Sequence, residues 1–268
     1  MKVCVIGNGG REHALAWRLS ISPSVTKVYA IPGSAAMSDC AELVGIDWQQ
    51  SDHLITFLKD NQVDLVVVGP EAPLVAGLAD TLNKAGIPVV LDPVGSGATS
   101  YRRQVVEKLL SEVKFALIRG NAGEIAPLAK IQWTSKGVDA GAGEADLAQV
   151  AKQVAQQYHC IVAISGETDF VSDGQRVAKV QNGTPLFPKI TGSGCLLGAV
   201  CGAFLSVAPA SAYFDAVVEA TTVYAVAGEF AARTLNSTQT GTFAVKFLDQ
   251  LAEINMTLAE QQGRVIYA

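Results

Sequence analysis

The first third of the chain repeats one pattern, in which a short β-branched apolar run is followed by turn residues and then by a helical spacing. This pattern predicts strands at residues 2–6, 27–31 and 64–68 and helices at residues 12–20 and 51–60. A strand that is followed by a helix returns to the same edge of the sheet, so that successive strands run parallel. The sequence therefore predicts an α/β fold with a mostly parallel sheet.

The remaining residues continue the alternation less regularly. The predicted helices span residues 74–85, 101–110, 146–158, 195–207, 211–234 and 240–256, and the predicted strands span residues 87–91, 115–118 and 160–164. A hairpin is expected at residues 169–180, turning at Asp173-Gly174, and only helices are expected from residue 194 onward. No internal repeat or flexible linker interrupts the chain, so we expect a three-layer αβα arrangement around one continuous sheet.

Composition excludes several classes of protein. The 268 residues are 49% apolar and 17% charged, below the roughly 25% charged residues of an average globular domain, which excludes a disordered or strongly solvated chain and predicts a compact one. The net charge of −5 gives no general attraction to nucleic acids or to anionic membranes. Five scattered cysteines suggest neither a disulfide framework nor a zinc site, and we expect a cytoplasmic protein. The uncharged stretch 190–214 is interrupted by glycine and proline, so it predicts a buried helix rather than a membrane span.

A glycine-rich loop, residues 7–12, follows the first strand and opens the first helix. Glycines permit close approach of a ligand to the backbone, and the amides at a helix start favour a phosphate. The loop is not the dinucleotide motif GxGxxG, because Glu12 occupies its third glycine position. A tight turn without any ligand is the alternative.

A second loop, Gly192-Ser193-Gly194-Cys195, precedes a long apolar helix. Up to four backbone amides converge there, which predicts an anion hole for a phosphate in transfer. Cys195 falls in the first helical turn, where the helix dipole is expected to lower the thiol pKa. The alternative for Cys195 is a small core residue without a chemical role.

Two acidic residues follow neighbouring strands of the predicted sheet. Asp92 ends one strand, and Glu124 lies just after the next strand, so both are expected at the same sheet edge. A pair of carboxylates there suits Mg²⁺, which also takes water and phosphate oxygens as ligands. The alternative is helix capping, with Asn121 as N-cap and Glu124 as its capping-box partner.

The first 88 residues resemble a known family. The segments MKVCVIGNGGREHALAWRL, YAIPGSAAM and DLVVVGPEAPLVAGLADTLNKAGIP are similar to the N-terminal domain of phosphoribosylamine-glycine ligase. The resemblance implies that two loops face a phosphoribosyl substrate, through Asn8, Gly9, Gly10 and Glu71. The ATP-grasp domain that this ligase requires is missing, so ligase activity is not expected.

From about residue 89 the chain resembles a different family. The segments LDPVGSGATSYR, IRGNAGEI, SGETDFVSDG, KITGSGCLLGAV and GTFAVKFLDQL are similar to successive motifs of hydroxyethylthiazole kinase, a ribokinase-like enzyme, up to about residue 258. The resemblance implies a kinase with ATP as co-substrate and Mg²⁺ as cofactor. It implies that Cys195 acts as the base and that Asp92 and Glu124 bind the metal. It also implies that ATP is bound by Arg119, Asn121 and Ser165, and that the substrate and the anion are bound by Gly192, Ser193 and Gly194.

Together the two resemblances predict a chimera, natural or engineered, joined between residues 86 and 91. A Rossmann-like, ligase-derived first half (residues 1–88) would complete a ribokinase-like second half (residues 89–268). The first third of the kinase family, with much of its thiazole pocket and part of its trimer contact, is replaced. We therefore expect a monomer or weakened oligomer that binds a small phosphate or nucleotide with little or no turnover. The alternatives are an active kinase of a small alcohol such as hydroxyethylthiazole, and a metabolite-binding protein that uses the GNGGRE loop.

Overall fold

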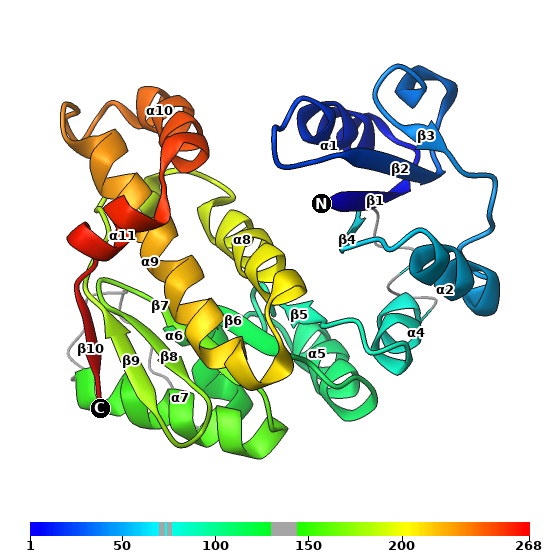
Figure 1. The fold of residues 1–268 in the computed structure, drawn as a ribbon. Coiled ribbons are helices and arrows are strands. Elements are labelled where there is room, and N and C mark those ends of the chain that lie inside the picture. The colour runs from blue at the N-terminus through cyan, green and yellow to red at the C-terminus, as the bar shows by residue number, and fades with distance from the viewer. Residues whose placement is uncertain (70–72, 74–76, 130–143) are drawn as a thin grey trace. The chain divides into compact units, whose positions relative to one another are not determined.

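The computed structural model describes residues 1–69, 73, 77–129 and 144–268 (Figure 1). The chain forms two compact units, Met1–Pro88 and Val89–Ala268. The boundary falls where the two sequence resemblances meet.

The first unit is built on a four-stranded parallel sheet in the order β3-β2-β1-β4. Its strands are β1 (Lys2–Gly7), β2 (Lys27–Pro32), β3 (Glu42–Leu43) and β4 (Leu65–Val68). Gly7 pairs with Pro32 and Ile6 pairs with Val68, so the carboxyl ends of these strands lie at one edge. The loop after β1 therefore opens at the edge where parallel sheets commonly bind ligands.

Helices join these strands. They are α1 (Gly10–Ser20), the short 3₁₀ helix η1 (Ala35–Met37), α2 (Ser51–Asp60) and α4 (Leu78–Lys84). Ala16 of α1 packs with Val5, Val28, Ala30 and Met37 in one buried cluster. The small side chain of Ala16 lets α1 lie close to the central strands.

The second unit is built on a mixed six-stranded sheet in the order β10-β9-β8-β7-β6-β5. Its strands are β5 (Val90–Leu91), β6 (Leu117–Asn121), β7 (Ile161–Ser165), β8 (Asp169–Ser172), β9 (Val177–Val180) and β10 (Val265–Tyr267). β5, β6 and β7 are parallel, whereas the pairs β7–β8, β8–β9 and β9–β10 are antiparallel. The predicted hairpin turn is confirmed, and Gly174 adopts a φ of +92° there.

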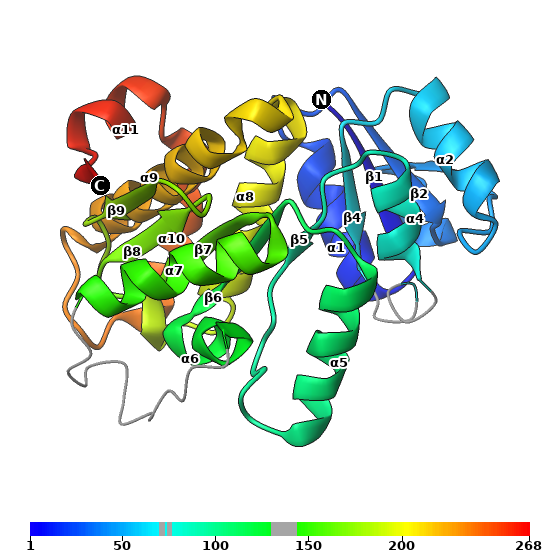
Figure 2. The ribbon, with the colours of Figure 1, turned by 90° about the horizontal axis from the view of Figure 1, so that it is seen from below.

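Helical layers cover the two faces of this sheet (Figure 2). The helices are α5 (Ser100–Glu112), α6 (Ala122–Ile125), η2 (Ala126–Ala129), α7 (Glu144–Tyr158), η3 (Phe187–Lys189), α8 (Ser193–Val207), η4 (Ala210–Ala212), α9 (Tyr213–Ala232), α10 (Thr240–Glu253) and α11 (Met256–Gln262). Alternate strand residues such as Ile161 and Ala163 join the core beneath α8 and α9, while α7 packs against β7 and β8. The three-layer α/β fold is thereby confirmed.

Four expectations differ from the structure. The described strands form two sheets, one in each unit, instead of one continuous sheet, because every hydrogen-bond ladder joins strands of the same unit. The strand expected at 87–91 comprises only Val90–Leu91. The helix predicted at 240–256 ends at Glu253, since Ile254 leaves the helical conformation, and the further helix α11 follows it. The chain also ends in strand β10 and not in a helix; three residues carry little local signal, and pairing with β9 stabilises them.

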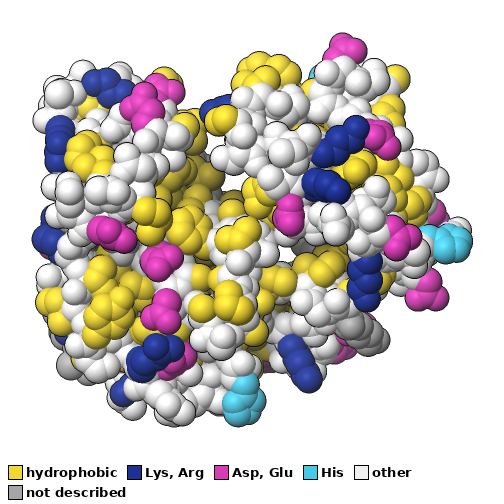
Figure 3. Space-filling model, in the orientation of Figure 1, with side chains coloured by type: hydrophobic (Ala, Val, Ile, Leu, Met, Phe, Trp, Pro, Cys, Tyr) yellow, Lys and Arg dark blue, Asp and Glu magenta, His cyan; other side chains and the backbone are white. Residues whose placement is uncertain are grey.

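The uncharged segment around α8 forms part of the core. Leu197, Cys201 and Leu205 repeat at four-residue spacing and are buried. No helix within the described ranges has the length and apolar character needed to cross a membrane. On the face drawn in Figure 3, side chains of both charges are scattered over each unit and do not gather into one basic patch.

Candidate functional site

The start of α8 forms the predicted amide-lined loop. Gly192 is the N-cap and adopts a φ of +88°, a left-handed conformation that favours glycine. The first helical bond joins the Leu196 amide to the Gly192 carbonyl at 2.9 Å, so the amides of the three preceding residues have no partner within the helix. Cys195 lies in this turn with an exposed side chain. The geometry matches an anion-binding helix start with a thiol beside it.

Arg119, on β6, lies next to this turn and is only 4% exposed. Its Nη1 donates to Asp92 Oδ2 at 2.9 Å, and its Nη2 donates to Ser165 Oγ at 2.7 Å. A Cβ atom at Gly194 would lie 2.8 Å from Nη1, so glycine at this position lets the guanidinium approach the helix. The buried Nε has no hydrogen-bond partner among the described residues. The structure thus brings together four predicted residues: Asp92 just after β5, Arg119 on β6, Ser165 on β7 and Gly194 on α8.

The carboxylates near Arg119 are electrostatically coupled. Burial raises the pKa of Asp92, the positive charge of Arg119 opposes this, and the negative charge of Glu124 adds to the increase. Burial also raises the pKa of Asp169, at the start of β8, to about 7, although the Gly166 amide and Arg119 favour its charged form. Asp169 belongs to the segment SGETDFVSDG, but the sequence analysis did not select it, because its proximity to Arg119 depends on strand pairing.

Glu124 acts as a helix cap. Its Oε2 accepts from the Asn121 amide at 2.9 Å, and the Glu124 amide donates to Asn121 Oδ1 at 3.0 Å. Its Oε1 also accepts from the Gly95 amide at 3.0 Å. The capping alternative left open by the sequence is therefore realised, and both oxygens of this carboxylate already accept backbone hydrogen bonds.

The fit of Mg²⁺ to this region rests on Asp92 and Glu124. The negative charge of Glu124 contributes to the raised pKa of Asp92, so a nearby cation would be favoured. Within the described ranges no three His, Cys, Asp or Glu side chains gather into a metal-binding group. Asp92 is already paired with Arg119, and Glu124 already accepts two backbone amides, so Mg²⁺ would share these oxygens and complete its shell with water and phosphate oxygens.

The glycine loop of the first unit has a different environment. The Gly9 amide donates to Glu12 Oε2 at 2.8 Å, and Arg11 Nε donates to Glu12 Oε1 at 3.1 Å. A second Arg11 nitrogen donates to the Gly69 carbonyl. Burial raises the pKa of Glu12, but the bonds from Arg11 and Gly9 outweigh it and hold the pKa below its ordinary value. A negative charge of the chain itself therefore occupies this helix start.

The sequence prediction for this loop has a mixed outcome. Asn8, Gly9 and Gly10 are exposed at the strand edge, and the Gly69 amide donates to the Ile6 carbonyl at 3.0 Å, so the two predicted loops begin on neighbouring strands. Glu71 lies outside the described residues. The Gly9 amide is engaged by Glu12, which leaves the loop without one of the donors that a phosphate would use.

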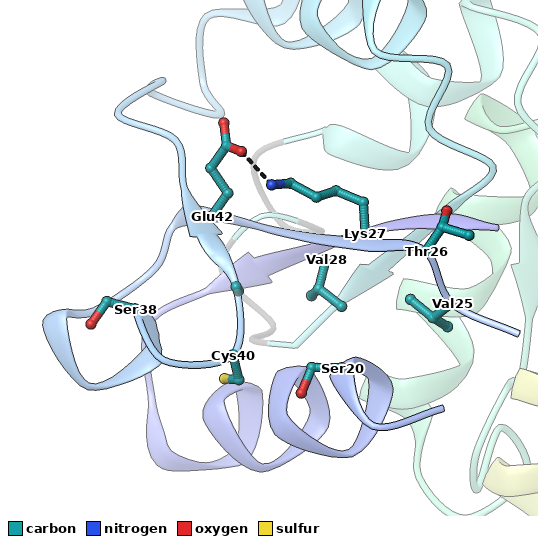
Figure 4. A pocket seen from close by; sticks show the side chains of 9 residues that line it. Ser20, Val25, Thr26, Lys27, Val28, Ser38, Cys40 and Glu42 are labelled. Atoms are coloured by element: carbon teal, nitrogen blue, oxygen red, sulfur yellow. Dashed lines mark ion pairs between the residues drawn. The ribbon is translucent and has the colours of Figure 1, made fainter. Parts of the chain in front are cut away.

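A surface pocket of about 380 Å³ lies elsewhere in the first unit (Figure 4). Its lining includes Lys27 and Glu42, which form an ion pair at 2.7 Å, together with Cys40. The pocket lies near the amino end of β2, whereas the Gly7 loop adjoins the carboxyl end. It is therefore distinct from both glycine loops, and no sequence motif indicated it.

Comparison with known proteins matches the chain to two families. The hydroxyethylthiazole kinase family matches residues 70–257, and the N domain of phosphoribosylglycinamide synthetase matches residues 1–99. The two matches overlap at residues 70–99, which include the boundary between the units.

Individual relatives come from the kinase family. The chain is 52% identical to hydroxyethylthiazole kinase of Histophilus somni (strain 129Pt) over 244 residues, covering 91% of this chain and 90% of the relative. It is 58% identical to the hydroxyethylthiazole kinase of Haemophilus influenzae (strain ATCC 51907 / DSM 11121 / KW20 / Rd) over 242 residues, covering 90% and 88%. Both alignments are longer than the second unit, so they extend into the first.

A solved structure shows the same fold. The hydroxyethylthiazole kinase protein from Pyrococcus horikoshii OT3 superposes with a TM-score of 0.71 at 24% identity, covering 99% of this chain and 93% of that one. The expected ribokinase-like architecture is confirmed by this similarity.

Proposed function

This chain belongs to the hydroxyethylthiazole kinase family, and on that basis we propose that its second unit binds ATP with Mg²⁺ beside the start of α8. The single observation that carries the proposal is the position of Arg119. Its buried guanidinium lies against the Gly194 turn, where the helix amides also favour negative charge. The positive guanidinium and the backbone amides of the helix start lie next to each other, and together they can bind the negative charges of a polyphosphate.

The residues of the site divide into three roles. Arg119, Ser165 and Asn121 hold the nucleotide, and the amides of Gly192, Ser193 and Gly194 receive the phosphoryl group in transfer. Asp92 and Glu124 hold Mg²⁺, which when bound would neutralise phosphate charge. Because Arg119 is paired with Asp92 and hydrogen-bonded to Ser165, nucleotide binding competes with these contacts for its donors.

Cys195 is proposed as the general base. Its exposed thiol at the first turn of α8 adjoins the anion-binding amides, so an acceptor alcohol could lie between them. The thiolate takes the proton of the alcohol while the alcohol oxygen attacks the γ-phosphorus and ADP leaves. A thiolate is a weak base toward an alcohol, so even a complete site would turn over slowly.

We propose that this protein is a chimera with little or no turnover of hydroxyethylthiazole. The first unit carries the glycine loop of the synthetase N domain, with Glu12 and Arg11 beside it. These charged groups and exposed glycines are poorly suited to an apolar thiazole ring. Loss of precise placement by about 1 Å can reduce a rate about a hundredfold.

An active small-alcohol kinase is the second candidate. The observation that favours it is the length of the kinase alignments, which extend into the first unit. On this proposal the chain would retain an acceptor pocket and phosphorylate the alcohol. The protein would in either case be cytoplasmic, and a monomer or weakened oligomer measurable by light scattering.

Calorimetry with ATP and Mg²⁺ tests the nucleotide proposal. We expect saturable binding by the intact chain and about ten- to hundredfold weaker binding by Arg119→Ala, the range of one charge-assisted hydrogen-bonding group. Arg103→Ala, which removes an exposed arginine of α5, is the matched control and should bind as the unaltered chain does. Absence of binding at millimolar ATP, or equal affinity of the two variants, would contradict the proposal.

A further inference from the structure

Tyr224, on α9, reaches the start of α8 through its hydroxyl group. The hydroxyl donates to the Ser193 carbonyl at 2.5 Å. The residue is 4% exposed, and burial raises its pKa, which keeps the hydroxyl protonated and able to donate. No sequence motif indicated this contact, because α9 was expected only to fill the core.

An aromatic cluster holds the Tyr224 ring in place. The ring stacks on Phe187 with centroids 5.1 Å apart, and it meets the edge of Phe247 with centroids 4.8 Å apart. Phe187 packs so closely against α9 that a Cβ atom at Gly228 would collide with its ring. The direction of the hydroxyl is therefore set by buried packing.

Ser193 is anchored a second time. Its Oγ donates to the Phe187 carbonyl at 3.0 Å. Phe187 thus stacks on the Tyr224 ring and also accepts the hydrogen bond from the Ser193 side chain through its carbonyl. Both contacts to Ser193 therefore depend on the packing of Phe187.

The carbonyl of Ser193 belongs to the same planar peptide group as the amide of Gly194. Holding one end of a planar peptide sets the direction of the other end. A hydrogen bond accepted by the carbonyl also strengthens the amide of that peptide as a donor. Arg119 approaches the same residue, since a Cβ atom on Gly194 would lie 2.8 Å from its Nη1.

We propose that Tyr224 is a positioning residue, whose hydroxyl aims the Gly194 amide at the phosphoryl group in transfer. The inference rests on the proposed function, since it assumes that this helix start binds phosphate. It adds a residue with no contact to the nucleotide, and it separates the orientation of the amide from the charge supplied by Arg119.

The test compares Tyr224→Phe with a matched control, Tyr158→Phe. Both variants keep the aromatic ring and lose a hydroxyl that donates to a backbone carbonyl, which for Tyr158 is that of Leu128 at 3.4 Å. The first measurement is the amide proton chemical shift of Gly194 in the ligand-free chain, which reports the donor strength and surroundings of that amide. The second is the affinity for Mg²⁺ with ADP alone and for Mg²⁺ with ADP and aluminium fluoride, which mimics the transferring group.

For Tyr224→Phe we expect the amide proton resonance of Gly194 to move upfield, because the amide becomes a weaker donor when its peptide carbonyl loses a hydrogen bond. Affinity for ADP with aluminium fluoride should fall about five- to tenfold, while affinity for ADP alone changes by less than about twofold. The control should leave all three quantities unchanged. A merely structural Tyr224 would lower both affinities equally together with the melting temperature, and that result would overturn the proposal.

An unchanged Gly194 chemical shift and unchanged affinities in Tyr224→Phe would also overturn it. If the unaltered chain binds no nucleotide, the proposed function fails, and the chemical shift still decides whether Tyr224 acts on the Gly194 amide. An upfield change in that case would support the positioning role, and an unaltered shift would refute it.

Discussion

Two helices of this chain begin after glycine-rich turns, and the charged groups beside them have opposite signs. At α1 the Gly9 amide donates to the carboxylate of Glu12, a residue of the same helix. At α8 the neighbouring charge is the guanidinium of Arg119, contributed by strand β6. The group against the helix start is therefore negative in the first unit, where Arg11 pairs with it, and positive in the second, where Asp92 pairs with it.

Glycine has the same geometric role in both places. A Cβ atom at Gly69 would collide with Glu12, and one at Gly194 would approach Arg119 closely. In each case the missing side chain lets a charged group lie against the backbone. A glycine-rich helix start therefore permits anion binding, and the charge that packs beside it determines whether binding is favourable.

The largest expected difference between the units is catalytic. With hydroxyethylthiazole and ATP, we expect a rate at least about a hundredfold below that of a relative such as the Histophilus somni enzyme, because the proposed chimera would no longer place the acceptor precisely. Coupled ADP release measures the rate, with Cys195→Ala as the comparison. A Cys195-dependent rate close to that of the relative would contradict the proposal of a chimera with little turnover.

Nucleotide should stabilise one unit more than the other. At ATP concentrations about a hundred times the dissociation constant, ligand binding adds about 2.7 kcal/mol to the stability of the state that binds. Hydrogen exchange followed by peptide mass spectrometry should therefore show ATP protection in residues 89–268 and little change in residues 1–88. Greater protection of the first unit would reverse the assignment of the binding site.

Removing the charge of Glu12 should make the glycine loop at the start of α1 bind anions more readily, as is proposed for the loop at the start of α8. Glu12→Gln keeps an oxygen for the Gly9 amide and removes the negative charge, so we expect affinity for inorganic phosphate to rise by about tenfold, close to the contribution of one charged neighbour. Amide chemical shifts of Gly9 and Gly10 during a phosphate titration would report it. Glu42→Gln, an exposed carboxylate of the same unit, is the control; equal affinity in all three proteins would show that Glu12 does not block the loop.

The smallest expected effect is the pH dependence of this same contact. The folded-state pKa of Glu12 lies below its ordinary value of 4.5, so its charge stabilises the fold above that pH. This contribution is lost as pH falls through the folded-state pKa. Melting temperatures of the unaltered chain and of Glu12→Gln should therefore differ at pH 6 and converge at lower pH. A difference that grows on acidification would contradict the direction of the shift.

Local pattern was sufficient for most elements of the fold. Helix α2 was predicted with its observed bounds, Ser51–Asp60, and the hairpin turn at Asp173-Gly174 was predicted correctly. These features depend on apolar spacing and on turn residues within a few positions of one another. The change of motif placed a junction between residues 86 and 91, close to the boundary of the two units, although one continuous sheet was expected across it.

The pairing of strands that lie far apart in the chain could not be predicted from local pattern. Strand β10 pairs with β9 across more than eighty residues, and the two sheets are separated because no ladder joins their strands. Short strands such as β5 and β10 have too few residues for a clear period. Their existence is decided by the hydrogen-bonding partner that the fold supplies.

The sequence by itself determined which residue types stand at the strand ends and helix starts, including Asp92, Arg119 and the Gly192–Cys195 loop. Tertiary structure alone decided their partners: Arg119 with Asp92, Glu12 with the Gly9 amide, and Tyr224 with the Ser193 carbonyl. The physical reason is that propensity and spacing act along the chain, whereas burial and hydrogen-bond direction depend on residues brought together from distant positions. Which charged side chain packs beside a glycine turn depends on such distant residues. The sign of the charge next to each helix start could therefore be seen only in the folded protein.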